Sequence, residues 1–447
     1  MPLRQEIRRT ARLAFPVVGT QISTMLLGTV DTLMVGRVSI EALGAAALAN
    51  AWFLGTTQFA LGVLFGLDPI ITQAHGAGRP RLVGLALQRG LVLAGLISVP
   101  LAGLWMGTEA FLLWAGQDAE LSRTAFEYTR VQIPSIPFFL AYTVLRQYLQ
   151  GRELVRPALW VILIANVLNV GFNWVLIFGN LGFPAMGLTG AGIATSLTRA
   201  TAFAGLLLWV LRFGLHRGAW VPWSREALQP RGLLAVLRFG IPVGIQTSLE
   251  FWAFSAAALL AGWLGSEPLA AHIVALNMAA LAFMVPLGIS QAAVTRVGNL
   301  LGAGDRAGAQ RAAWVALALG SGVMLISATV FVVFRHQLPR IYTPDAAVIA
   351  LCSSILPIAA AFQIFDGAQV VGCGVLRGMG RTRPAAVFNA ISYWALGLPL
   401  AWALGLRGGW GLAGIWWGLC FGLAVVAIFL TGWIYFRGPA TVRDRAF

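Results

Sequence analysis

Long apolar stretches alternate with short polar connections along almost the whole of this 447-residue chain. Most of these stretches reach the roughly 20 residues that a helix needs to cross the hydrocarbon core of a bilayer. The pattern predicts an all-α polytopic membrane protein with twelve transmembrane helices. The predicted spans are 13–35, 44–73, 85–107, 131–149, 159–180, 187–211, 236–262, 268–295, 312–334, 347–375, 385–406 and 410–435.

Charged residues fall mainly in the connections, and their placement predicts the orientation of the chain. The sequence is 58% hydrophobic and 11% charged, and its 31 basic residues, all arginine, give a net charge of +15. The termini and the even-numbered connections hold nearly all of the arginines. By the positive-inside rule, both termini are expected in the cytoplasm. The positive charge is then a topology signal, so the expected partner is the lipid bilayer and not nucleic acid.

An internal repeat divides the sequence into two halves. One constant shift aligns Pro16 with Pro242, Glu41 with Glu267, and the GAG at 76–78 with the GAG at 302–304. An even number of predicted spans separates the copies, so both have the same orientation, as in transporters with a central cavity between two bundles. We therefore expect an N-terminal six-helix lobe (1–211), a cytoplasmic linker (212–235) and a C-terminal six-helix lobe (236–447).

Three acidic residues lie well inside predicted spans: Asp31, Glu250 and Asp366. A charged side chain at the bilayer centre costs about 2.5–3.5 kcal/mol, so these carboxylates are expected to face a shared watery cavity rather than lipid. The repeat aligns Asp31 with an alanine and Glu250 with a threonine, which indicates different roles for the two halves. The alternative is a buried structural pairing, and Arg199 is the one arginine well inside a span.

Amide and aromatic side chains accompany these acids. Amide oxygens beside carboxylates suit a bound sodium ion or a hydrogen-bonded proton, although amides also join membrane helices structurally. Aromatic faces beside a carboxylate suit a lipophilic organic cation, although aromatic residues also pack or face lipid. The candidates for this substrate or second-cation site are Asp31, Asn169, Asn173, Gln21, Gln246, Trp252 and Phe365.

Several segments together resemble the multidrug and toxic compound extrusion (MATE) family, and its NorM-type bacterial branch most. They include FPVVGTQISTMLLGTVDTLMVGR near the start, NVLNVGFNW, and FQIFDGAQVVGCGVLRGMGRTRP. The resemblance implies two pseudo-symmetric six-helix bundles that form a central cleft. It also implies an antiporter that exports lipophilic, often cationic, drugs and toxic compounds by alternating access, coupled to an inward flow of sodium ions or protons.

The resemblance also implies roles for individual residues. Asp31 matches the acidic position of the N-terminal lobe, with Asn169 and Asn173 as its fifth-helix amides. Glu250 and Asp366 match the acidic pair that the NorM-type branch uses for its coupling cation, which makes them the candidate sodium site. Pro16 and Pro242 match lobe-equivalent prolines at which helices bend. Some relatives carry a further acid in the eighth helix, where this chain has Asn277.

On this interpretation the protein is a monomeric transporter of the bacterial inner membrane, not an enzyme, and it needs no cofactor. The alternative function is a flippase or exporter of a lipid-linked or polysaccharide precursor, since such exporters share the doubled six-helix plan. An anionic headgroup would favour a cationic cavity, whereas the interior charges here are mainly acidic. A membrane enzyme is disfavoured because neither HExxH nor DDxxD occurs.

Overall fold

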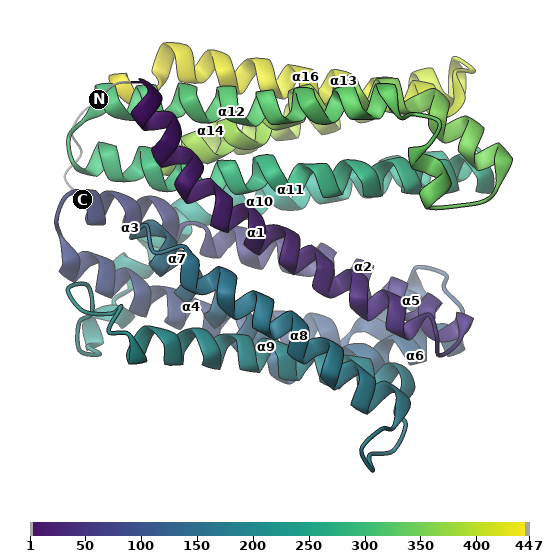
Figure 1. Ribbon diagram of the computed structural model, residues 1–447, viewed down its shortest axis with the longest axis horizontal. Coiled ribbons are helices and arrows are strands. Elements are labelled where there is room, and N and C mark those ends of the chain that lie inside the picture. The colour runs from purple at the N-terminus through teal and green to yellow at the C-terminus, as the bar shows by residue number, and fades with distance from the viewer. Residues whose placement is uncertain (1–2, 443–447) are drawn as a thin grey trace. The chain divides into compact units, whose positions relative to one another are not determined.

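A computed structural model describes residues 3–442, and within them every regular element is helical (Figure 1). The helices of the first half are α1 Leu3–Val35, α2 Ile40–Leu64, α3 Leu67–Gly76, α4 Pro80–Met106, α5 Thr108–Trp114, α6 Ala119–Arg130, η1 Ile133–Ser135, α7 Ile136–Gly151, α8 Arg156–Phe178, α9 Gly187–Arg212 and η2 Arg225–Leu228. The second half contains α10 Pro230–Trp263, α11 Ser266–Gly302, α12 Arg306–Val333, η3 Leu338–Ile341, α13 Ala346–Gly378, α14 Thr382–Asn389, η4 Ala390–Gly397, α15 Leu398–Trp402, η5 Ala403–Arg407, α16 Gly411–Arg437 and η6 Pro439–Thr441.

Eleven helices in the described part of the chain are long and apolar enough to cross a membrane. They correspond to eleven of the twelve predicted spans. The fourth predicted span, 131–149, consists of the 3-10 turn η1 and the 16-residue helix α7, which is too short to be counted among the eleven. Pro134 and Pro137 are the second residues of η1 and α7, where their missing N–H groups interrupt the ladder of helical hydrogen bonds.

Short polar side chains define where several helices begin. The Oγ of Ser39 accepts a hydrogen bond from the N–H of Ala42 at the start of α2, with a distance of 3.0 Å. Asp118, Asp305 and Asp345 similarly accept hydrogen bonds from backbone N–H groups in the first turns of α6, α12 and α13. These N-caps satisfy donors that have no partner inside the helix, so the helix starts are encoded locally.

The chain forms two compact units. Unit 1 comprises Met1–Gln21, Gly76–Gly78 and Ile245–Phe447, and unit 2 comprises Ile22–His75 and Arg79–Gly244. These units differ from the predicted lobes, because the first half of α1 groups with the C-terminal part of the sequence. The first part of α10 groups likewise with the N-terminal part. Both helices are continuous and long, so each contributes residues to both units.

Glycines allow these two helix segments to pack closely. In unit 2, Gly66 lies so close to the backbone of Val236 and Gly240 in α10 that a Cβ atom would clash. In unit 1, Gly288 of α11 lies equally close to Val18 of α1. Small residues at helix contacts are a common way for membrane helices to associate, because they let the backbones approach. The packing therefore explains why α1 and α10 each belong to both units.

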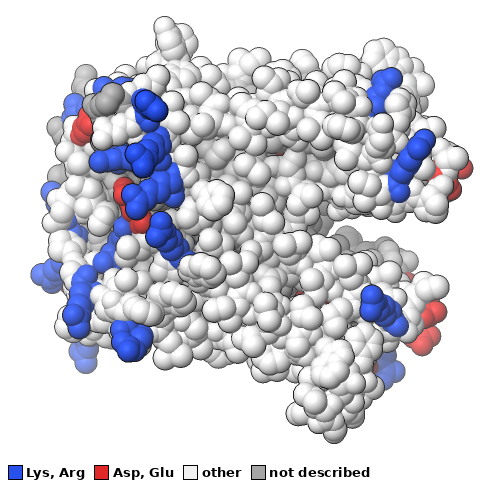
Figure 2. All heavy atoms as spheres, in the orientation of Figure 1, with Lys and Arg blue, Asp and Glu red and all other residues white. Residues whose placement is uncertain are grey.

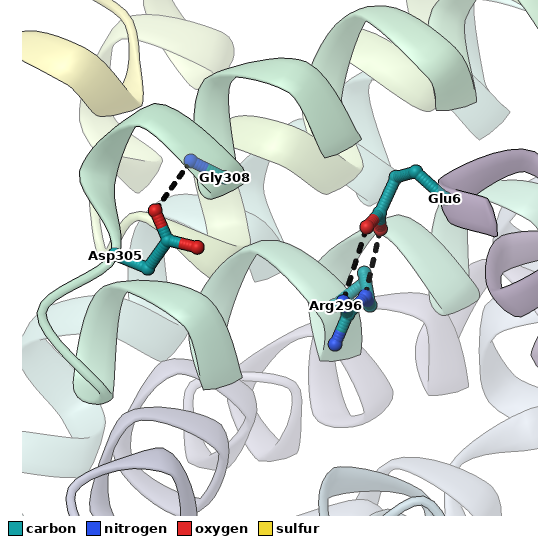
Figure 3. Close-up of polar contacts among 4 residues, drawn as sticks. All are labelled: Glu6, Arg296, Asp305 and Gly308. Atoms are coloured by element: carbon teal, nitrogen blue, oxygen red, sulfur yellow. Dashed lines mark hydrogen bonds and ion pairs between the residues drawn. The ribbon is translucent and has the colours of Figure 1, made fainter. Parts of the chain in front are cut away.

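Charged side chains lie at the ends of the helices in each unit, and Figure 2 shows an almost uncharged surface between these ends. One arginine near such an end is buried. Arg296 of α11 donates two hydrogen bonds to Glu6 of α1, from Nε to Oε1 at 2.7 Å and from Nη2 to Oε2 at 3.1 Å (Figure 3). Their side chains are only 8% and 4% exposed. This ion pair fixes the beginning of α1 to unit 1.

Candidate functional site

Asp31 lies in a hydrogen-bonded cluster within unit 2. The residue is 6% exposed. Its Oδ1 accepts a hydrogen bond from Nδ2 of Asn173 at 2.6 Å, and its Oδ2 accepts one from the hydroxyl of Thr195 at 3.0 Å. Nδ2 of Asn173 also lies 3.1 Å from Oδ1 of Asn169, and Nδ2 of Asn169 lies 3.3 Å from the hydroxyl of Thr198. The structure thus brings together the three predicted residues of this site.

The cluster follows from the packing of α1, α8 and α9. Asn169 and Asn173 are one turn apart, so they present their amides on one face of α8, which packs against α9. The hydroxyl of Thr195 is 3.0 Å from Asp31 and also 3.0 Å from the carbonyl oxygen of Ala191. Since a hydroxyl has one hydrogen, Thr195 can keep a partner within α9 when Asp31 binds something else.

Arg199 lies within electrostatic range of Asp31 but forms no ion pair with it among the described residues. Its guanidinium lies over the rings of Phe53 and Phe139, at 4.6 and 5.3 Å from their centroids, and Nη1 donates to the hydroxyl of Ser135 at 3.1 Å. These aromatic faces and the hydroxyl stabilise the cation. The Asp31 carboxylate is therefore not taken up by a structural ion pair.

A second acidic cluster lies in unit 1. Glu250 of α10 is half-buried, Asp366 of α13 is 5% exposed, and the two carboxylates interact electrostatically. Nε2 of Gln369, one turn after Asp366, lies 3.4 Å from Oε2 of Glu250 and 3.2 Å from Oδ1 of Asn389. Among residues 3–442, no group donates a hydrogen bond to the side-chain carboxylate of Asp366.

Aromatic rings pack beside this cluster, but not all of the predicted ones do. Phe254 is one turn beyond Glu250 and contacts Phe362 and Tyr393, with centroid distances of 5.9 Å in both cases. Trp252 is two residues from Glu250, which places it on nearly the opposite face of α10, where it is 41% exposed. Phe365 is half-buried and forms no ring stacking among the described residues. The aromatic neighbours of the acids are Phe254, Phe362 and Tyr393, and Trp252 is not among them.

The remaining predicted residues lie on α1 and α10. Gln246 is buried one turn before Glu250 and lies near the thiol of Cys373. Gln21 is half-buried and belongs to unit 1, whereas Asp31 belongs to unit 2. Pro16 and Pro242 lie inside helices that continue through them. The hydroxyl of Thr20 bonds to the carbonyl oxygen of Pro16 at 2.9 Å, which is a local feature of a helix able to bend.

Sequence reasoning missed several polar neighbours of the acids. Gln369 lies three residues after Asp366, so helical spacing alone could have found it. Thr195 and Thr198 carried no such signal, because threonine is common in membrane helices and these two are far from Asp31 in sequence. The missed residues are Thr195, Thr198, Gln369, Asn389 and Tyr393.

The geometry limits what the clusters can hold. No group of three or more His, Cys, Asp or Glu side chains suitable for a metal ion occurs in the described range. A cation in unit 1 would therefore be held by two carboxylates together with neutral oxygen atoms. Such ligands suit a hard monovalent cation, or a proton shared with a hydrogen-bond acceptor.

Comparisons with known proteins agree with this architecture. The MatE family profile matches residues 16–175 and 242–403. The chain is 40% identical over 445 residues to a probable multidrug resistance protein NorM of Mesorhizobium japonicum, with 96% of this chain and 94% of that protein covered. It is 33% identical over 440 residues to the multidrug resistance protein NorM of Vibrio cholerae, with 97% and 96% covered.

Solved structures show the same fold. The eukaryotic MATE transporter AtDTX14 matches with a TM-score of 0.91 and 24% identity, covering 98% of this chain and 97% of its own. An outward-facing MATE transporter of the MOP superfamily matches with a TM-score of 0.88 and 20% identity, covering 98% and 96%. Since the family profile spans most of the sequence and includes Asp31, Glu250 and Asp366, the chain belongs to the MatE family of transporters and is NorM-like.

Proposed function

We propose that this protein is a sodium- or proton-coupled antiporter that exports lipophilic, often cationic, compounds by alternating access. The observation that carries the proposal is a pair of acidic sites in membrane-spanning helices, one in each unit and neither closed by an ion pair among the described residues. The similarity to NorM proteins, whose names state multidrug resistance, supports the export of drugs and toxic compounds.

Competition for carboxylates supplies the coupling. A carboxylate in a membrane can hold a sodium ion, a proton or an organic cation, but holding two of these together is electrostatically unfavourable. Binding of the inward-moving cation therefore weakens the binding of a cationic drug. Because linkage is reciprocal, drug binding also favours release of the coupling cation.

The two sites take different roles in this scheme. Glu250 and Asp366 bind the coupling cation, since the two acids interact with each other and neither forms an ion pair among the described residues. Asp31, with Asn169 and Asn173, binds a second cation or contacts the drug. The aromatic rings of Phe254 and Phe362 beside the coupling site give a lipophilic cation an apolar contact surface.

We further propose that the protein is a monomer in the bacterial inner membrane with both termini in the cytoplasm. The arginine-rich connections support this orientation through the positive-inside rule. Reporter fusions at each terminus test it: a cytoplasm-dependent reporter should be active at both ends. Activity of a periplasm-dependent reporter at either end would refute the assignment.

Transport by the purified protein in lipid vesicles tests the function. Efflux of a fluorescent lipophilic cation is measured under an imposed sodium gradient and, separately, an imposed proton gradient. We expect one gradient to drive efflux, and Asp31→Asn, Glu250→Gln and Asp366→Asn to abolish or strongly reduce it. Glu120→Gln is the matched control, because Glu120 is an exposed acid in the first turn of α6.

The alternative is a flippase or exporter of a lipid-linked or polysaccharide precursor. If neither gradient moves the dye although the protein is folded, drug antiport is refuted. The same vesicles are then assayed for transfer of a labelled lipid-linked sugar between leaflets. Transfer that survives all three acid substitutions would also rule out a coupling role for these carboxylates.

A further inference from the structure

Two buried oxygen atoms beside the acids of unit 1 have no hydrogen-bond partner among the described residues. They are Oε1 of Gln369 and the hydroxyl oxygen of Tyr393. Gln369 is 1% exposed and Tyr393 is 0% exposed. Buried polar atoms are nearly always satisfied in native proteins, and an exception indicates a bound water or ion. The question is what these two oxygens bind.

Both oxygens belong to side chains that are held next to the carboxylates. Nε2 of Gln369 lies near Glu250 and also near Oδ1 of Asn389, and Nδ2 of Asn389 donates to the carbonyl oxygen of Ala385 at 2.8 Å. The Tyr393 ring packs against Phe254, and both Glu250 and Asp366 act electrostatically on its hydroxyl. Packing thus holds the two side chains beside the carboxylates before any ligand arrives.

The backbone around Tyr393 is also unusual. Tyr393 lies in η4, a π-helical segment that begins directly after Asn389. Nε1 of Trp394, the next residue, donates to the carbonyl oxygen of Leu249 at 3.0 Å, which ties η4 to α10 beside Glu250. Single π-helical turns are rare and occur frequently at functional sites, where they redirect side chains. Tyr393 lies in this π-helical segment, and the hydrogen bond of Trp394 holds the segment against α10.

We propose that the Gln369 amide oxygen and the Tyr393 hydroxyl oxygen are ligands of a dehydrated sodium ion that Glu250 and Asp366 hold. The inference rests on the proposed coupling role of these acids and extends it. A proton on one carboxyl group needs only one acceptor, whereas this cluster offers two neutral oxygens and two carboxylates. Neutral ligands replace the hydration shell of sodium without adding negative charge.

The orientation of Gln369 is consistent with this role. Its nitrogen faces Glu250 at 3.4 Å, a long distance for a hydrogen bond to a carboxylate. An amide turned over by half a rotation occupies the same space and presents its oxygen to Glu250. A cation between the two groups would select that orientation. Nε2 would then occupy the place of Oε1, so the amide would lose its present contact with Asn389.

Direct binding of radioactive sodium to the purified full-length protein, without drug or gradient, tests the proposal. Tyr393→Phe removes only the hydroxyl, and Gln369→Leu removes the amide at nearly constant volume. Each variant should weaken sodium binding by about tenfold or more, the scale seen for loss of groups around a bound metal. Tyr142→Phe is the matched control, since the Tyr142 hydroxyl is also buried without a partner among the described residues but lies in unit 2.

Gel filtration and thermal unfolding of each variant establish that it is folded. Unchanged sodium affinity in both folded variants would overturn the proposal. Absence of sodium binding to the wild-type protein would overturn it too, and the proposed antiport would stand if a proton gradient still drives dye efflux. If the wild-type protein binds sodium and both variants bind it more weakly, this inference holds. If no gradient then drives dye efflux, the proposed drug export is refuted.

Discussion

In unit 2 the Asp31 carboxylate accepts short hydrogen bonds from Asn173 and Thr195, whereas in unit 1 Asp366 accepts none from any described residue. Both acids are nearly fully buried in helices of the same repeated fold. A buried carboxylate that accepts hydrogen bonds from fixed donors contributes to stability, whereas one that accepts none is free to bind a ligand. The difference indicates that unit 2 stabilises its acid, and that unit 1 keeps its acids available for a ligand.

The ion pairs show a second contrast between the units. Within the described residues, unit 1 contains the buried pair of Glu6 and Arg296, whereas the ion pairs of unit 2, Arg81 with Glu226 and Arg123 with Glu127, are largely exposed. Buried pairs respond strongly to the loss of one partner, and exposed pairs respond weakly. Unit 1 therefore depends on one ion pair to fix the start of α1.

Removing one partner of that buried pair should have the largest effect on stability. Glu6→Leu leaves the Arg296 charge without its carboxylate and should destabilise the protein by about 3–5 kcal/mol. Thermal unfolding in detergent measures the loss. Glu6→Leu combined with Arg296→Met should recover most of it, because a buried pair can be replaced by apolar side chains. Equal stability of wild type and Glu6→Leu would show that the pair does not fix α1.

Leucine substitutions at the two acids compare the sites directly. Asp31→Leu leaves Asn173 and Thr195 without their acceptor and should cost about 1–3 kcal/mol of stability. Asp366→Leu removes a buried carboxylate that accepts no hydrogen bond from the described residues, so its stability should equal or exceed that of the wild type. Thermal unfolding of both variants without sodium provides the comparison. If Asp366→Leu lost more stability than Asp31→Leu, the assignment would be wrong. Asp366 would then be the acid that stabilises the fold.

Thr195→Val isolates one hydrogen bond of the Asp31 cluster. The change keeps the shape of the side chain, and an interhelical hydrogen bond in a membrane contributes about 0.6 kcal/mol on average. We expect a decrease of this size in unfolding free energy, together with altered dye transport. Thr329→Val is the control, because the Thr329 hydroxyl is exposed and bonds within its own helix, to Leu325 at 2.9 Å.

The ion pair of Arg81 with Glu226 in unit 2 should have the smallest effect. Arg81 and Glu226 are 78% and 36% exposed, and their charges are screened by solvent and salt. Arg81→Gln should change the unfolding free energy by about 0–1 kcal/mol, and high salt should remove even that difference. A loss as large as that of Glu6→Leu would contradict the contrast drawn between the units.

The sequence by itself determined the class of protein, most of its spans and the buried acids. Hydrophobic length predicts membrane helices because a helix satisfies its own backbone, and intramembrane carboxylates stand out because few other charges occur there. Helical spacing alone also pairs Asn169 with Asn173, because residues four apart lie on one face of a helix. These patterns are local in the sequence, so they do not depend on which helices pack against one another.

Contacts between helices were decided only by the tertiary structure. Thr195 meets Asp31 from a position far along the chain, and nothing in its neighbourhood in sequence distinguishes it from other membrane threonines. Phe254 meets Phe362 of α13 and Tyr393 of η4 only because these segments pack together, and the π-helical segment set the position of Tyr393. Local sequence fixes whether a helix forms, but which side chains complete a site depends on how several helices rotate and pack against one another.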